Sequence, residues 1–303
     1  VEVARCMETV DDQINDVVAR YCIVNGCAEI ILPALSPKLR RKLAPLVPLS
    51  TDGERDSFYE KFDMKTTLQY YEEAKRSRGI AKVQFLLLCG RQNEAAMLAV
   101  QLLRSLISQG LYNYSDAMDI IQLIRNIYVT EEDKKEPIWN EVVTLCFYFG
   151  VYEALWRGYD SIIERLVAST VEMINNHNID YLKPKINEMK IAAALALAKF
   201  KASIGKAYIE TCKFESEALN GIKLLQDDVS VDGGSTVVGL GTGNLPVHLS
   251  SNPIISVCSG LKIDGNVFYL EDGESAMSAE EALMWFEVNP FSPLKTHERL
   301  FPY

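Results

Sequence analysis

Apolar residues recur at helical spacing along most of the segment 1–226. Two series show this most clearly: Ala117, Ile120, Ile121, Ile124, Ile127 and Tyr128, and Tyr159, Ile162, Ile163, Leu166, Val167, Thr170 and Ile174. Offsets of three, four and seven positions place each series on one face of a helix with about 3.6 residues per turn. The pattern predicts two long amphipathic helices, and Thr130 with the acidic residues after it predicts a helix start between them.

Two further segments predict helices that are packed on several sides. Residues 95–107 are apolar almost all round, which is typical of a buried central helix. Residues 191–202 are rich in alanine, and small side chains let neighbouring helix axes approach closely.

A local pattern recurs four times: an apolar helix end, a glycine or its substitute, and then a glutamate followed by a small or apolar residue. Its turn positions, Gly26, Gly90, Gly150 and Lys213, are almost evenly spaced along the chain. Glycine ends a helix at low cost, and a carboxylate suits the start of the next helix. The pattern therefore predicts an all-α fold, an α-solenoid of stacked antiparallel helical hairpins. An irregular all-helical domain, in which the recurrence is chance, remains the alternative.

Glycine and proline positions predict the domain boundaries. Prolines between Pro33 and Pro48, continued by residues 50–53, predict a first linker. Eight of the seventeen glycines and five of the eleven prolines fall between Asp227 and Tyr303. We therefore expect a helical repeat domain over residues 1–226, a linker over 227–253 and a small acidic α+β module over 254–303.

The C-terminal module is expected to be a hairpin followed by a helix. Residues 254–258 and 266–270 are rich in β-branched and aromatic residues, and Asp264 and Gly265 between them favour a turn. Ser278 and Glu281 have capping-box spacing, which predicts a helix over residues 279–286.

Charge and cysteine content exclude several classes of protein. The net charge is −10, and most of it comes from the segment 227–303, where acidic side chains far outnumber basic ones; this argues against nucleic-acid binding. No apolar run is long enough to cross a bilayer, so no membrane span is expected.

The seven cysteines form no Cys-x-x-Cys pair and follow no secretory signal, which favours reduced thiols and a cytoplasmic location.

The densest basic run comprises Lys38, Arg40, Arg41 and Lys42. Its position between Pro37 and Pro45 predicts a solvated loop. The alternative is a weak contact with an anionic partner or lipid surface, as in a membrane-coat adaptor.

The best candidate for small-molecule chemistry is the glycine-rich segment Gly239–Gly243. A phosphate-binding loop needs a helix directly after it, whereas Pro246 and Pro253 follow here, so a linker is favoured over a phosphate-binding enzyme. His248, Cys258 and His297 are single and scattered, so no zinc site is expected. The sequence has only three histidines, and it contains no nucleophile motif and no metalloprotease motif. We therefore expect no catalytic residue and no cofactor.

Large aromatic residues near the C-terminus are the candidate interaction residues: Trp285, Phe286, Phe291, Phe301 and Tyr303. Such side chains dominate protein interfaces, so they could anchor a partner. Docking onto the helical domain is favoured, because a module of this size buries too little surface by itself.

Two sequence segments resemble those of a known family: residues 85–90 with Glu94 and Ala95, and residues 207–209 with 217–219. They resemble tetratricopeptide-like helical pairs in the C-terminal halves of large WD-repeat scaffolds of the coatomer and intraflagellar-transport type. Cys258, Trp285 and residues 289–293 resemble the small, often zinc-binding module that ends such proteins, although the paired cysteines are missing. The resemblance spans residues 80–303.

This resemblance implies that the chain is the C-terminal part of a longer protein in which a β-propeller precedes the helices. It implies a non-enzymatic scaffold whose partners are other protein subunits of a transport or ciliary-type assembly. The expected location is then the cytoplasm or the cilium.

Overall fold

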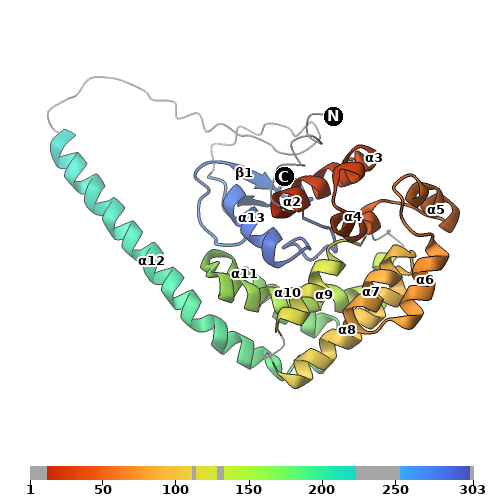
Figure 1. The fold of residues 1–303 in the computed structure, drawn as a ribbon. Coiled ribbons are helices and arrows are strands. Elements are labelled where there is room, and N and C mark those ends of the chain that lie inside the picture. Colours follow the sequence, from red (N-terminus) through yellow and green to blue (C-terminus); the bar gives the residue numbers. More distant parts are fainter. Residues whose placement is uncertain (1–11, 111–113, 128–132, 223–252, 301–303) are drawn as a thin grey trace. The chain divides into compact units, whose positions relative to one another are not determined.

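The structure, a computed structural model, describes residues 12–110, 114–127, 133–222 and 253–300 (Figure 1). The described residues form twelve α-helices and one two-stranded sheet, so the fold is all-α, as predicted. The chain divides into two compact units, Val1–Cys146 and Phe147–Tyr303, and the long helix α10 (Pro137–Arg157) crosses this division. The predicted boundaries at positions 226 and 227 lie outside the described residues.

Unit 1 is built from helices alone in its described part. Its elements are α2 (Asp12–Val24), α3 (Ala28–Ile31), η1 (Leu32–Ala34), α4 (Pro37–Leu43), η2 (Ala44–Leu46), α5 (Asp52–Glu60), α6 (Thr67–Arg76), α7 (Gly79–Leu88), α8 (Gln92–Gln109), α9 (Tyr114–Ile124), η4 (Asp133–Lys135) and the first half of α10. Helix α7 packs against α6, α8 and α9, and it therefore lies at the centre of this part of unit 1 (Figure 1).

Local sequence explains where several of these helices start and end. Thr51 and Thr66 each begin a helix with a complete capping box. Gly26 and Gly90 follow α2 and α7 with φ angles of +81° and +73°, so these two predicted turns are confirmed.

The segment predicted as the first linker is helical, so that prediction is wrong. Pro37 occupies the first turn of α4, where its missing N–H costs nothing, and the Ser36 hydroxyl accepts a hydrogen bond from the Leu39 N–H at 3.3 Å. The buried leucines Leu32, Leu39 and Leu43 tie the segment into the core. The basic run thus lies on a helix and not on a solvated loop.

The third and fourth copies of the predicted recurrence are not turns. Gly150 lies inside α10, which continues to Arg157 and is followed by Gly158 at a φ of +72°. Lys213 lies inside α12 (Lys185–Ile222). Two of the four expected helix ends are therefore absent, and the even spacing of the pattern does not mark equivalent units.

The two amphipathic series predict their helices correctly. The first lies on α9 and at Ile127 just beyond it, with Tyr128 outside the described residues, and the second lies on α11 (Asp160–Asn176). In each helix the apolar face is buried, as Ile121 and Ile163 illustrate with no exposed surface.

The two segments expected to be packed on several sides are more exposed than predicted. Helix α8 includes residues 95–107, but Met97 is 48% exposed, so this helix is amphipathic. The alanine-rich segment forms part of α12, where Ile191 and Leu195 are 76% and 79% exposed. Its small side chains therefore do not mark close packing on all sides.

Unit 2 combines helices with a small sheet. It contains the second half of α10, then α11, α12, β1 (Val267–Tyr269), β2 (Ala276–Ser278) and α13 (Ala279–Val288). Helix α11 packs against both α12 and α13. The capping box of Ser278 and Glu281 is confirmed, and α13 continues past the predicted end at Phe286 to Val288.

The C-terminal module contains a hairpin, but the prediction that residues 254–258 pair with residues 266–270 is wrong. Strand β1 pairs antiparallel with β2, so that Val267 faces Ser278 and Tyr269 faces Ala276. Residues 254–258 make only isolated bridges, from Ile255 to Lys262 and from Ser256 to Ala276. The turn between β1 and β2 is stabilised instead by the Asp272 carboxylate, which accepts hydrogen bonds from two backbone N–H groups.

Within the part of the chain that the structure describes, none of the helices has the length and apolar character needed to span a membrane.

Candidate functional site

The candidate site begins with α4, which carries the densest basic run of the sequence. Leu39 and Leu43 are buried and fix one side of this helix in the core. Lys38, Arg41 and Lys42 are spaced by three and four positions, so they share another side. Lys38 and Arg41 are exposed, and neither forms an ion pair among the described residues.

Arg40 has a different role from its three basic neighbours. Its guanidinium donates hydrogen bonds to the carbonyl oxygens of Leu32 at 2.9 Å, Phe62 at 2.8 Å, Leu35 at 3.1 Å and Pro33 at 3.2 Å. These bonds join α4 to η1 and to the end of α5. Of the four residues expected at an anionic surface, Arg40 is therefore used to hold α4 in place.

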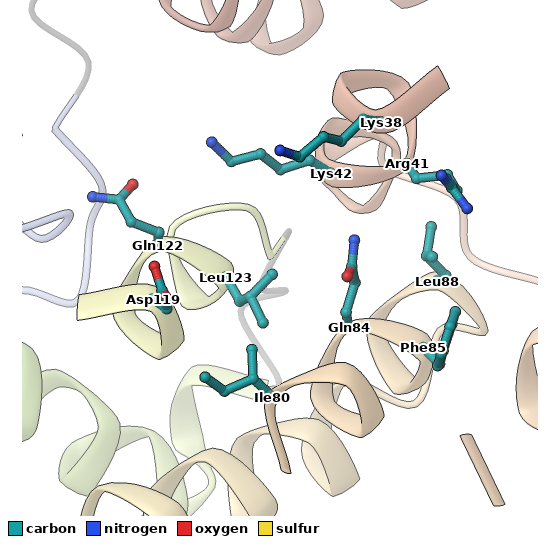
Figure 2. A pocket seen from close by; sticks show the side chains of 10 residues that line it. All are labelled: Lys38, Arg41, Lys42, Ile80, Gln84, Phe85, Leu88, Asp119, Gln122 and Leu123. Atoms are coloured by element: carbon teal, nitrogen blue, oxygen red, sulfur yellow. The ribbon is translucent and has the colours of Figure 1, made fainter. Parts of the chain in front are cut away.

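Helices α4, α7 and α9 enclose a groove of about 490 Å³, which we call the α4 groove (Figure 2). Its lining residues come from three separate stretches of sequence: Lys38, Arg41 and Lys42 on α4, Ile80, Gln84, Phe85 and Leu88 on α7, and Asp119, Gln122 and Leu123 on α9. This volume lies within the range of about 300–1,000 Å³ that is usual for binding sites.

The three cationic side chains of the α4 groove all come from α4. Figure 2 shows the ammonium groups of Lys38 and Lys42 extending from α4, while Ile80 and Leu123 lie close together on the opposite side. Asp119 is the one carboxylate in the lining, against three cations. The groove therefore has a positively charged wall on α4 and a base in which four apolar side chains lie among two glutamines and Asp119.

A second hollow of about 250 Å³ adjoins the α4 groove at Arg41, which lines both. Its apolar lining residues are Phe62, Met64 and Tyr70, of which Phe62 and Tyr70 are buried, and Tyr70 stacks on Phe85 with ring centroids 6.3 Å apart. Arg41 thus borders two adjacent depressions along α4.

The aromatic residues predicted as interaction anchors lie inside unit 2 where they are described. Trp285 packs edge-on against Phe147 at 5.8 Å, and its indole N–H donates to the Phe291 carbonyl oxygen at 2.8 Å. Trp285, Phe286 and Phe291 are at most 3% exposed. Phe301 and Tyr303 lie outside the described residues. The three described aromatic residues therefore pack in the interior of unit 2.

The other candidates from the sequence do not form a site in the described residues. Gly239–Gly243 and His248 lie outside them. Cys258 is buried, and His297 stacks on His177 with ring centroids 6.4 Å apart. No group of three or more potential metal ligands is found among the described histidine, cysteine and acidic residues.

Burial raises the pKa of several groups that could act as nucleophiles. Desolvation raises the pKa of the Cys22 and Cys89 thiols, and it raises that of Cys258 strongly. The pKa of Tyr59 is also raised by burial, and its hydroxyl donates to the Leu88 carbonyl oxygen at 2.8 Å. An activated nucleophile needs a lowered pKa, so these groups are suited to packing.

Sequence reasoning found one wall of the α4 groove and missed the rest. The basic run was visible, but the residues of α7 and α9 join it only through tertiary packing. Ile80, Gln84 and Leu88 recur at every fourth position, which places them on one ridge of α7. That spacing was the available signal, but it does not indicate which helix the ridge faces.

A scan against protein-family models finds no match for this chain, and a search of solved structures finds no significant match. By its described residues, the protein is an all-α protein with two helical units and a small two-stranded sheet.

Proposed function

We propose that this chain is a non-enzymatic scaffold that binds a segment of a partner protein in the α4 groove. The observation that carries the proposal is the groove itself, whose cationic wall faces a partly apolar base. Interfaces commonly combine apolar anchor sites with charged surroundings that select the partner and its orientation.

Two further observations support a binding role over a catalytic one. The thiols and tyrosines with a perturbed pKa are made less reactive by burial, as Cys89 and Tyr59 show. Helix α12 also presents Ile191 and Leu195 to solvent on one face, which is a feature of surfaces that contact other chains.

We also propose that the scaffold belongs to a larger WD-repeat protein of a cytoplasmic or ciliary transport assembly. The support for this wider placement is the resemblance of residues 85–90 and 207–209 to tetratricopeptide-like pairs. Stacking of the helices as a solenoid is part of the same proposal.

Site-specific photo-crosslinking in the full-length chain tests the proposed function. A photoreactive amino acid is placed at Gln84 or Gln122, which line the α4 groove, and at the exposed control position Lys75 on α6. We expect a discrete crosslinked partner protein from the two groove positions and not from Lys75. The crosslinks should disappear in an Ile80→Asp background, because a charge is then placed on the apolar base.

Equal crosslinking from Lys75, or crosslinks that persist with Ile80→Asp in a folded chain, would contradict the proposal. Retained helical circular dichroism shows that the variant is folded. Ile80 is half-buried in the first turn of α7, where an aspartate is compatible with the helix dipole.

A further inference from the structure

The geometry of the α4 groove points to the chemistry of its occupant. We propose that it binds an extended peptide segment of a partner protein that combines acidic residues with large apolar ones. This inference rests on the proposed function and adds the class of partner segment.

The acidic character follows from the charges around the groove. Lys38 and Arg41 are exposed, and Lys42 lies on the same side of α4. Like charges at helical spacings of three and four positions repel each other. A carboxylate placed between them relieves this repulsion, and it can form a bidentate pair with the Arg41 guanidinium.

The apolar character follows from the base of the groove. Ile80 supplies aliphatic surface and Phe85 adds an aromatic face, whereas the lining residues Leu88 and Leu123 are buried. Ile80 and Phe85 are half-buried, so each keeps apolar surface in contact with water. Covering that surface with a leucine or phenylalanine of the partner is favourable, because it removes apolar surface from water.

The extended shape of the occupant follows from the neighbouring hollow. Because Arg41 lines both depressions, a chain that pairs with Arg41 can reach Leu123 on one side and Met64 on the other. The charged groups that also border these depressions are Arg40, Asp119, Asp63 and Lys65, and Lys65 pairs with Glu73. The basic groups therefore remain in excess along α4.

The same observations favour a peptide over an anionic membrane. A lipid surface requires cations that project from a convex face, whereas Lys38 and Lys42 border a depression that also contains Asp119. Arg40, the fourth residue of the basic run, uses its donors on backbone carbonyl groups. A membrane contact is thus the competing outcome of the test.

Fluorescence anisotropy with the full chain and a labelled synthetic peptide tests the inference. The peptide has about twelve residues, in which glutamate alternates with leucine and phenylalanine. One matched peptide replaces glutamate by glutamine, and another replaces the apolar residues by serine. We expect binding of the first peptide to exceed that of either matched peptide by about tenfold, and to weaken as salt is raised.

Charge-reversal variants locate the binding. Lys38→Glu with Lys42→Glu should weaken binding of the acidic peptide about tenfold or more. The matched control, Arg76→Glu with Arg78→Glu, makes the same change of charge at exposed positions outside the groove, and it should change binding less than about twofold. Ile80→Asp should weaken binding without altering either basic residue.

Each remaining outcome contradicts the inference in a different way. Equal binding of the glutamate and glutamine peptides, together with a partner crosslink from Gln84, overturns the acidic preference and leaves the proposed function intact. Loss of both the peptide binding and the crosslink overturns both. Flotation with phosphatidylserine vesicles that depends on Lys38 and Lys42, without peptide binding, replaces the peptide by a membrane surface.

Discussion

At the residue scale, Gly90 meets two separate structural requirements. Its φ angle of +73° suits glycine, and a Cβ added there would overlap the Arg55 guanidinium group. Arg55 cannot move away without loss, because it is buried and donates to the Leu49 carbonyl oxygen at 2.8 Å. Gly90 therefore allows the chain to turn after α7, and its missing side chain leaves room for the buried Arg55 guanidinium.

Gly90→Ala should accordingly destabilise the protein by about 2–4 kcal/mol, from backbone strain and the displaced charged hydrogen bonds. Gly79→Ala is the matched control, because Gly79 has a φ of +57° but open space around its Cβ position. We expect that variant to lose only about 1–2 kcal/mol. Urea denaturation measures both, and equal losses would show that Arg55 is not a constraint.

The adjacent arginines of α4 provide a second residue-scale test. Arg40 donates to four carbonyl oxygens, whereas Arg41 is exposed and donates to the Pro37 carbonyl oxygen at 3.2 Å. A lysine has no planar fork of donors and cannot replace the first arrangement. Arg40→Lys should cost about 1–3 kcal/mol of unfolding free energy, and Arg41→Lys less than about 0.5 kcal/mol.

The measurement is the shift of the urea midpoint for each variant. Equal shifts would mean that the bonds of Arg40 do not hold α4. Both residues are arginines in one basic run, so the sequence offered no basis for separating them. The distinction depends on where the carbonyl groups of residues 32–35 and Phe62 lie, which only the fold determines.

At the element scale, helix α10 shows how local patterns can misplace a helix end. Gly150 is preceded by aromatic residues and followed by Glu153, which is the expected turn pattern. In the structure it is a helical residue against which Val288 and Asn289 pack; its Cβ position lies 3.3 Å from the Val288 carbonyl oxygen. A close approach between segments therefore explains this glycine, and that reason cannot be read from local sequence.

Alanine substitutions distinguish the two glycines Gly150 and Gly158. Gly158→Ala should cost about 1–2 kcal/mol, because Gly158 has a φ of +72° and follows the end of α10. Gly150→Ala should change stability by less than about 1 kcal/mol, since the higher helix propensity of alanine offsets the tight contact. Thermal denaturation monitored by circular dichroism checks the order, and the reverse order would place the helix end at Gly150.

Other elements could be predicted to different degrees. The apolar series predicted α9 and α11 correctly, because burial of one helix face requires apolar residues at regular helical spacing. The capping box before α13 was reliable because it is a local interaction. The pairing of β1 with β2, in contrast, depended on which of two turns forms, and Asp272 decides it through hydrogen bonds that Asp264 and Gly265 do not supply.

At the scale of the whole molecule, acid should weaken unit 2. A hydrogen bond from Lys295 is the main cause that lowers the pKa of Glu172 below its ordinary value of 4.5. Hydrogen bonds from Ser275, its side chain first, lower the pKa of Asp272 below 3.8. A carboxyl group with a lowered pKa adds stability above its ordinary pKa and loses this contribution as the pH falls through the folded value.

The melting temperature should therefore fall as the pH is lowered from about 5 to about 3. Glu172→Gln combined with Asp272→Asn should be less stable than the wild type near neutral pH, but it should lose less over this interval. Melting curves at stepped pH measure the difference. Parallel losses in both proteins would show that these two carboxylates do not contribute to the acid response.

The central claim, that the α4 groove is a binding site, is tested most directly by methyl nuclear magnetic resonance of the full chain. The acidic, apolar peptide is added to protein labelled at isoleucine and leucine methyl groups. We predict chemical-shift changes at Ile80, Leu88 and Leu123, with none at Ile191 or Leu195 on α12. Changes confined to α12, or none at the three groove residues under saturating peptide, would contradict the account.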